Sequence, residues 1–285
     1  SSVAGMWRRN YRLVGGKFRT LIIFRVSLRQ PSNRNDRQGA NMPEPARYRL
    51  QLLIALLAGL LGWSSAVRAG DVARLEILGF SHNGAVFAFE EYGVQDGSGF
   101  PYANRYYIDT ASDSFVKGTP IRVRLDDESA TIDAARAEAR RKGETIIAQS
   151  ELDANRGYTA GYNPVTELSA DAHRMVVNPR PILPPIDTPL EFRLEETGLT
   201  GSELCQTQGE IKGFRLLRIG DGGKASVLHE DASIPKSRGC PNGYRIGAVQ
   251  TFSSPDLRAY AVVISVRQYG FEGPDYRWIA VTGQM

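Results

Sequence analysis

Two segments far apart in the chain share one pattern, and this constrains the fold more than any other feature. The first, FEEYGVQDGSGFPYANRYYIDT, spans residues 89–110, and the second, VVISVRQYGFEGPDYRWIAVT, spans residues 262–282. Each pattern is typical of an apolar strand, a long polar hairpin with glycines, and a second strand. Because such a unit leaves an apolar face uncovered, the repetition predicts that the two units pack in one core in related orientations, with Phe87 and Phe89 corresponding to Tyr260 and Val262.

The remaining sequence after residue 70 favours further strands around one helical region. Alternating apolar and polar residues predict strands in ARLEILGFS, PIRVRLDD, LEFRLEE, IKGFRLLRIGDGGKASVLHED and YRIGAVQTFS. Residues 129–155 predict a helical insert, with basic residues 140–142 before Gly143 as the C-terminal cap. We therefore expect a mainly β fold: a compact β-rich domain with two blade-like strand-hairpin-strand repeats and a helical insert. A small β-propeller is the alternative.

Residues 42–69 have the three parts of a secretory signal peptide. Arg47 and Arg49 precede an apolar run over 50–63, and Val67 and Ala69 place small side chains where a signal peptidase reads them. The apolar run is shorter than the roughly 20 residues that a membrane-spanning helix needs. We expect cleavage after Ala69 and a periplasmic or secreted protein without a membrane span.

The predicted cleavage site divides the chain into three parts. Residues 1–41 are rich in arginine and precede a complete signal peptide, so we interpret them as an upstream extension outside the working protein, with a long cytoplasmic n-region as the alternative. Residues 70–285 then form a single secreted domain, long enough to bury a core of its own.

The charge of the predicted mature chain differs in sign from that of the whole sequence. The full chain has 35 Lys and Arg against 31 Asp and Glu, a net charge of +4, but residues 70–285 hold 23 against 29, a net −6. Because nucleic-acid binding draws much of its affinity from Lys and Arg at phosphates, an acidic domain argues against a nucleic-acid partner.

The two cysteines, Cys205 and Cys240, both follow the predicted cleavage site. In an oxidising compartment an even pair predicts a disulfide. A metal site is the competing interpretation, but two cysteines without a histidine at ligand spacing cannot complete a tetrahedral shell.

The polar hairpins of the two repeats supply the candidate binding residues. They carry carboxylates and one arginine each, close enough in sequence to pair: Glu90, Glu91, Asp96, Arg105, Glu272, Asp275 and Arg277. We expect both hairpin tips on the same side of the domain, where they form a shared binding surface, with exposed ion pairs contributing at most about 1 kcal/mol each. Solvated turns without a function are the alternative interpretation.

No residue pattern predicts a catalytic, metal or cofactor site. The three histidines, His82, His173 and His229, fall in different predicted elements and are not spaced as ligands, and GSGF at residues 97–100 lacks the serine hydrolase pattern. The hairpin carboxylates allow a glycosidase hypothesis if they face each other at roughly 5–10 Å. We therefore predict no cofactor and no metal.

Two resemblances follow from longer strings. The segment GFSHNGAVFAFEEY with RYYID resembles a blade of the periplasmic propellers of the Tol system, over about 30 residues. Over its mature length the chain resembles a bacterial family of predicted secreted proteins that contain a domain of unknown function, through GFSHNGAVFAFEEYGVQDGSGFPYA, PKSRGCPNGYRI and GFEGPDYRWIAVTG. The second resemblance implies a signal peptide and an extracytoplasmic compartment, and no activity or site residues.

Three functional hypotheses follow. The first is a non-enzymatic secreted or periplasmic protein that binds a protein or envelope ligand. The second is a carbohydrate-active or other hydrolase that uses the hairpin carboxylates. The third is a structural module of an envelope assembly.

Overall fold

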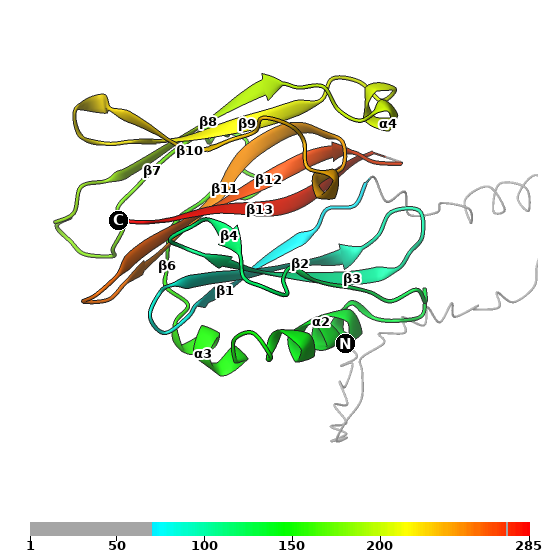
Figure 1. The fold of residues 1–285 in the computed structure, drawn as a ribbon, viewed down its shortest axis with the longest axis horizontal. Coiled ribbons are helices and arrows are strands. Elements are labelled where there is room, and N and C mark those ends of the chain that lie inside the picture. The colour runs from blue at the N-terminus through cyan, green and yellow to red at the C-terminus, as the bar shows by residue number, and fades with distance from the viewer. Residues whose placement is uncertain (1–69, 272) are drawn as a thin grey trace, which may run out of the picture. The chain divides into compact units, whose positions relative to one another are not determined.

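A computed structural model describes residues 70–271 and 273–285 (Figure 1). The signal peptide and upstream extension predicted within residues 1–69 lie outside the described residues, and so does Glu272. The described part contains three antiparallel sheets, none of which closes into a barrel, and a few short helices, so the predicted mainly β class is confirmed.

The helix-side sheet has five strands, in the order β1-β2-β3-β4 with β5 also paired to β3. Its strands are β1 (Arg74–Phe80), β2 (Val86–Val94), β3 (Pro101–Asp109), β4 (Ser114–Phe115) and β5 (Ile121–Arg124). One face of this sheet is covered by the helices α2 (Ile132–Gly143) and α3 (Gln149–Ala154). Both helices fall inside the predicted insert at residues 129–155.

The central sheet has the order β13-β12-β11-β6, and the outer sheet has the order β10-β9-β8-β7. The central strands are β6 (Tyr158–Tyr162), β11 (Pro241–Ser253), β12 (Arg258–Tyr269) and β13 (Pro274–Gln284). The outer strands are β7 (Arg174–Val177), β8 (Leu190–Gly198), β9 (Lys212–Ile219) and β10 (Ala225–Glu230). Three short helices complete the described chain: α4 (Glu203–Gln206), η1 (Asp221–Gly223) and η2 (Lys236–Arg238).

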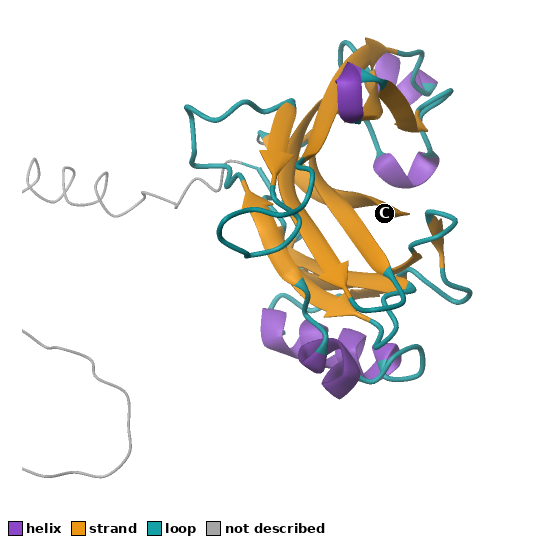
Figure 2. Ribbon diagram, turned by 90° about the vertical axis from the view of Figure 1, so that its left-hand side faces the viewer, coloured by secondary structure: helices purple, strands orange, loops and turns teal. Residues whose placement is uncertain are grey.

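Three apolar cores separate four layers. One core lies between the outer and central sheets, a second between the central and helix-side sheets, and a third between the helix-side sheet and the helices. Figures 1 and 2 show this order, with the helical layer below the stacked strands. In a β-propeller the sheets are arranged as blades around a central axis, whereas these three sheets lie one on top of another. The alternative of a small β-propeller is therefore wrong.

The central sheet is buried on both faces, and the sequence of β12 explains why. Residues 259–266, AYAVVISV, are apolar apart from Ser265 instead of alternating with polar residues, and all eight are buried. A strand covered on both sides has this pattern. In the outer sheet, by contrast, β8 buries Leu190, Phe192 and Leu194 while Arg193 and Glu195 are exposed.

The two repeated segments form the hairpins β2–β3 and β12–β13, but their corresponding residues lie in different cores. Phe87 and Phe89 pack between the helix-side and central sheets, whereas Tyr260 and Val262 pack between the central and outer sheets. Both hairpins nevertheless contribute to the core between the helix-side and central sheets, where β12 and β13 add Ala259, Ala261, Val263 and Trp278. The two units therefore meet in one core, as expected, but through residues that do not correspond in the repeat. Superposition of the two units stays a prediction.

The helix α2 begins as its sequence predicts and ends differently. The Thr131 hydroxyl caps it by accepting a hydrogen bond from the Ala134 amide at 3.1 Å. Gly143 was expected as the cap, but it is the last helical residue and is buried. A β-carbon at this position would lie 2.3 Å from the Tyr107 hydroxyl, so the glycine allows close packing of helix and sheet.

Candidate functional site

Glu90 and Arg105 form a buried ion pair and do not lie at a hairpin tip. They are cross-strand partners on β2 and β3, are 0% and 4% exposed, and their Oε2 and Nε atoms are 2.6 Å apart. Arg136 from α2 donates its Nε–H to the other Glu90 oxygen, and Arg105 also donates to Gln149 from α3 at 2.8 Å. The expectation of an exposed pair is wrong, because strand alternation turns both side chains toward the helices.

The buried Glu90 carboxylate is not accessible to a ligand. Both oxygens of Glu90 accept from arginines within the core. Glu90 therefore cannot join Asp275 in an open cleft, as the glycosidase hypothesis requires of its carboxylates.

Glu91, the next residue, points to the opposite face and joins two sheets. It is 2% exposed, and its Oε1 accepts from Asn104 at 3.0 Å and from the Tyr106 hydroxyl at 2.6 Å. Its Oε2 accepts from the backbone amide of Trp278 on β13 at 2.8 Å. Burial and the adjacent Glu91 carboxylate raise the pKa of Tyr106 well above its usual value, so this phenol stays a donor.

Arg277 pairs with Asp71, a residue that the sequence analysis did not select. Arg277 Nη2 lies 2.6 Å from Asp71 Oδ2, and the Tyr102 hydroxyl donates to Asp71 Oδ1 at 2.9 Å. The Asp71 amide donates to Asp275 Oδ1 at 2.8 Å, which ties the first described residues to the start of β13. Burial raises the pKa of Asp71 and outweighs the opposing effect of Arg277. No sequence signal identified Asp71, because its partners lie 31 or more positions away.

Two of the candidate residues, Asp96 and Asp275, lie at the hairpin tips. Asp96 is half-buried in the β2–β3 loop, where Gly97 and Gly99 adopt positive φ angles of 80° and 70°. Asp275 is half-buried at the start of β13. A role of these residues and of Glu272 in binding stays a prediction.

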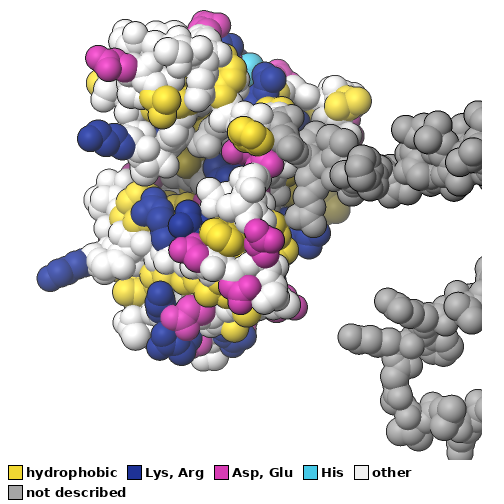
Figure 3. Space-filling model, turned by 90° about the vertical axis from the view of Figure 1, so that its right-hand side faces the viewer, with side chains coloured by type: hydrophobic (Ala, Val, Ile, Leu, Met, Phe, Trp, Pro, Cys, Tyr) yellow, Lys and Arg dark blue, Asp and Glu magenta, His cyan; other side chains and the backbone are white. Residues whose placement is uncertain are grey.

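A groove lies beside Arg277, where the helix-side sheet meets the central sheet. It consists of two adjoining hollows of about 440 and 520 Å³ that both include Asn104, Arg122 and Arg277; we call it the arginine groove. Figure 3 shows Lys and Arg side chains in and beside a hollow at mid-height on this side of the domain. Arg124, at the smaller hollow, pairs with Asp126 at 2.7 Å.

The larger hollow is bordered by η2, which brings Lys236 and Arg238 to the groove. Arg238 is paired with Asp231 and is stacked 5.2 Å from the centre of the Phe214 ring, whereas Lys236 is exposed. Burial raises the pKa of Asp231, but hydrogen bonds from His229 and Arg238 outweigh it and hold that pKa below the usual 3.8.

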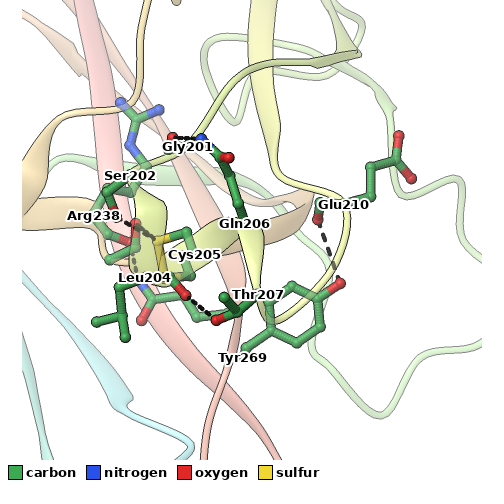
Figure 4. Close-up of a disulfide and its surroundings, with 12 residues drawn as sticks. Gly201, Ser202, Leu204, Cys205, Gln206, Thr207, Glu210, Arg238 and Tyr269 are labelled. Carbon is green, nitrogen blue, oxygen red and sulfur yellow. Dashed lines mark hydrogen bonds between the residues drawn. A yellow bond between two sulfur atoms is a disulfide. The ribbon is translucent and has the colours of Figure 1, made fainter.

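The predicted disulfide holds this border in place and is confirmed. Cys205 on α4 and Cys240 are joined by a 2.03 Å bond between their sulfur atoms (Figure 4). Cys240 follows η2 by two residues, and the Ser202 hydroxyl contacts Cys205 Sγ at 3.3 Å. The bond thereby anchors the segment that carries Lys236 and Arg238.

Within residues 70–271 and 273–285, no group of three or more His, Cys, Asp or Glu side chains is arranged to hold a metal ion. In the same ranges, no helix is both long and apolar enough to cross a membrane. The donors that line the arginine groove are the guanidinium groups of Arg122 and Arg277 and the side-chain amide of Asn104, which both hollows share.

Comparison with known proteins places the chain in a family. No curated protein and no solved structure matches it. A family model described as "Predicted secreted protein (DUF2259)" matches residues 88–284, which include every strand from β3 to β13. The chain, with its stacked sheets and arginine groove, therefore belongs to this family of predicted secreted proteins.

Proposed function

We propose that the chain is a non-enzymatic, extracytoplasmic protein that binds an anionic ligand of the cell envelope in the arginine groove. The observation that carries the proposal is Arg122. It is exposed where the two hollows adjoin and, among the described residues, forms no ion pair with a carboxylate. An arginine in this position is available to pair with a carboxylate, sulfate or phosphate of a ligand.

The charge distribution supports the same conclusion. Residues 70–285 carry a net −6, yet the groove gathers five cationic side chains: Arg122, Arg124, Lys236, Arg238 and Arg277. Three of these are neutralised by aspartates, and Lys236, like Arg122, forms no ion pair within the described ranges. Glu91, Asp113 and Asp126 also line the groove, so its attraction for anions depends on Arg122 and Lys236, which are exposed and form no ion pair with a described residue.

The test is binding of model polyanions to the exported full-chain protein. We expect polygalacturonate or dextran sulfate to bind in isothermal titration calorimetry, uncharged dextran not to bind, and affinity to fall as salt rises. Arg122→Glu should reduce affinity at least tenfold. Lys224→Glu is the matched control, because Lys224 is an exposed cation in the turn between β9 and β10.

Two results would contradict the proposal. One is the absence of binding to either polyanion at low salt. The other is an equal loss of affinity in both charge reversals, which would indicate attraction to the whole surface instead of the groove.

We also propose that the chain reaches its compartment by cleavage after Ala69. The support for this boundary is the sequence pattern, in which Val67 and Ala69 place small side chains at the two positions that a signal peptidase reads, directly before Gly70. Intact-mass measurement of the exported protein should give a chain that begins at Gly70. A mature species that retains Arg47 would contradict the signal peptide.

A further inference from the structure

A second hollow, separate from the arginine groove, contains a concentration of unsatisfied polar atoms. It has a volume of about 300 Å³ and is lined by residues of β8, β9, β11, β12 and β13 and by Val165. Among the described residues, five buried side-chain N or O atoms lack a hydrogen-bond partner, and three of them belong to residues that line this hollow: Asn242 Oδ1, Arg245 Nε and Ser265 Oγ. Because buried polar groups are nearly always hydrogen-bonded, three such atoms around one space point to a ligand.

The strand register explains why these atoms converge. Arg245 on β11 is the cross-strand partner of Ser265 on β12, and Gly243 is the partner of Arg267. Residues two apart on a strand share a face, so Arg245, Ser265 and Arg267 face the same side. Gly243 adds no side chain to that face, and the hollow occupies the space.

Ser265 is the strongest indication of a site. Its side chain is on the central sheet, it is 1% exposed, and its hydroxyl has no partner in the described chain. A serine in the apolar run of β12 costs free energy unless its hydroxyl is bonded.

The residual charge of the hollow is positive. Lys212 is neutralised by Glu196 at 2.8 Å, and the second oxygen of Glu196 accepts from the Tyr244 amide at 2.7 Å. Arg245 donates Nη2 to Asn163 Oδ1 at 2.7 Å, which fixes its guanidinium without neutralising it. Neither Arg245 nor Arg267 forms an ion pair with any carboxylate of residues 70–271 and 273–285.

We propose that this hollow binds a small hydroxycarboxylate. The carboxylate accepts from Arg245 Nε and Ser265 Oγ, with Arg267 as a second cation, and the Asn242 amide bonds a hydroxyl of the ligand. Taking about 30 Å³ per water, the volume equals roughly ten waters, which suits a hydroxy acid or a single uronic acid. The hollow shares no lining residue with the arginine groove.

The test is calorimetric titration of the exported full-chain protein with citrate, galacturonate, galacturonate methyl ester and inorganic phosphate. We expect one or both carboxylates to bind at a single site, while the ester and phosphate do not. Citrate binding alone identifies a free hydroxy acid, whereas galacturonate binding identifies a sugar acid. Absence of binding to both carboxylates, or equal binding of the ester, overturns the proposal.

Ser265→Ala separates a ligand site from a structural serine. Removing an unsatisfied buried hydroxyl should leave the melting temperature of the free protein unchanged or raise it by about 2–4 °C, while affinity for the carboxylate falls at least tenfold. Ser226→Ala, at an exposed position of β10, is the matched control and should retain full affinity. Full affinity in Ser265→Ala overturns the proposal, as does a crystal structure at saturating carboxylate in which waters alone bond the three atoms.

Discussion

Substitution of Glu90 by Gln should destabilise the domain strongly, although the two side chains have nearly the same shape. Glu90 has no exposed surface and accepts from Arg105 and Arg136, and Arg105 is itself 4% exposed. A neutral amide leaves the Arg105 charge buried without its counter-ion. Breaking a buried pair in this way costs about 3–5 kcal/mol, which corresponds to a fall in melting temperature of roughly 6–20 °C at about 2–4 °C per kcal/mol for a domain of this size.

Glu76→Gln is the matched control for this prediction. Glu76 pairs with the same Arg136 at 3.3 Å, but its side chain is 34% exposed and that of Arg136 is 29% exposed. Water compensates for such a loss, so the expected cost is about 0–1 kcal/mol. Urea unfolding followed by circular dichroism measures both values, with unchanged slopes required for the comparison. A cost for Glu90→Gln within 1 kcal/mol of the control would refute the reasoning from burial.

Three further predictions concern stability. Replacing Cys205 and Cys240 together by Ala should lower the unfolding free energy by about 3–4 kcal/mol, from the entropy of the opened loop, as measured by urea unfolding. Asp231 has a lowered pKa in the folded state, so its contribution to stability is complete above its unfolded pKa of 3.8 and is lost as pH falls through the folded pKa. The difference in unfolding free energy between wild type and Asp231→Asn should therefore shrink in acid. A difference that stays constant with pH would contradict this. Gly143→Ala should destabilise by about 1–3 kcal/mol because its β-carbon meets the Tyr107 hydroxyl, whereas stabilisation, the usual result in a helix, would show that the contact is not limiting.

The sequence predicts elements better than it predicts the roles of charged residues. The apolar run of β12 and the helical insert could be predicted from the sequence, because each depends on a local residue pattern. The disulfide could be predicted because an even pair of cysteines follows a signal peptide pattern. The burial of Glu90 was not, since it depends on Arg136, which lies 46 positions later on a helix that covers the sheet. Glu91 likewise meets Trp278 across 187 positions.

The order of the layers could also not be predicted from the sequence pattern. Two similar hairpins can pack with their equivalent faces against each other or with those faces directed toward different layers. The sequence of the hairpins does not distinguish these two arrangements, because the difference lies in what covers each face. In this domain, the helices cover one hairpin and the outer sheet covers the other, so equivalent positions acquire different neighbours. The Ser265 hydroxyl can be recognised as an unusual buried polar group only after β12 is known to be buried on both faces.

The central sheet has a consequence for the order in which the domain can fold. Strands β11, β12 and β13 come from residues 241–284, after every strand of the other two sheets. Both cores between sheets contain residues of these strands, so neither core can be completed during synthesis until these strands have emerged. The two sheets made earlier keep apolar faces uncovered until then, and contacts between segments so distant in sequence make folding slow.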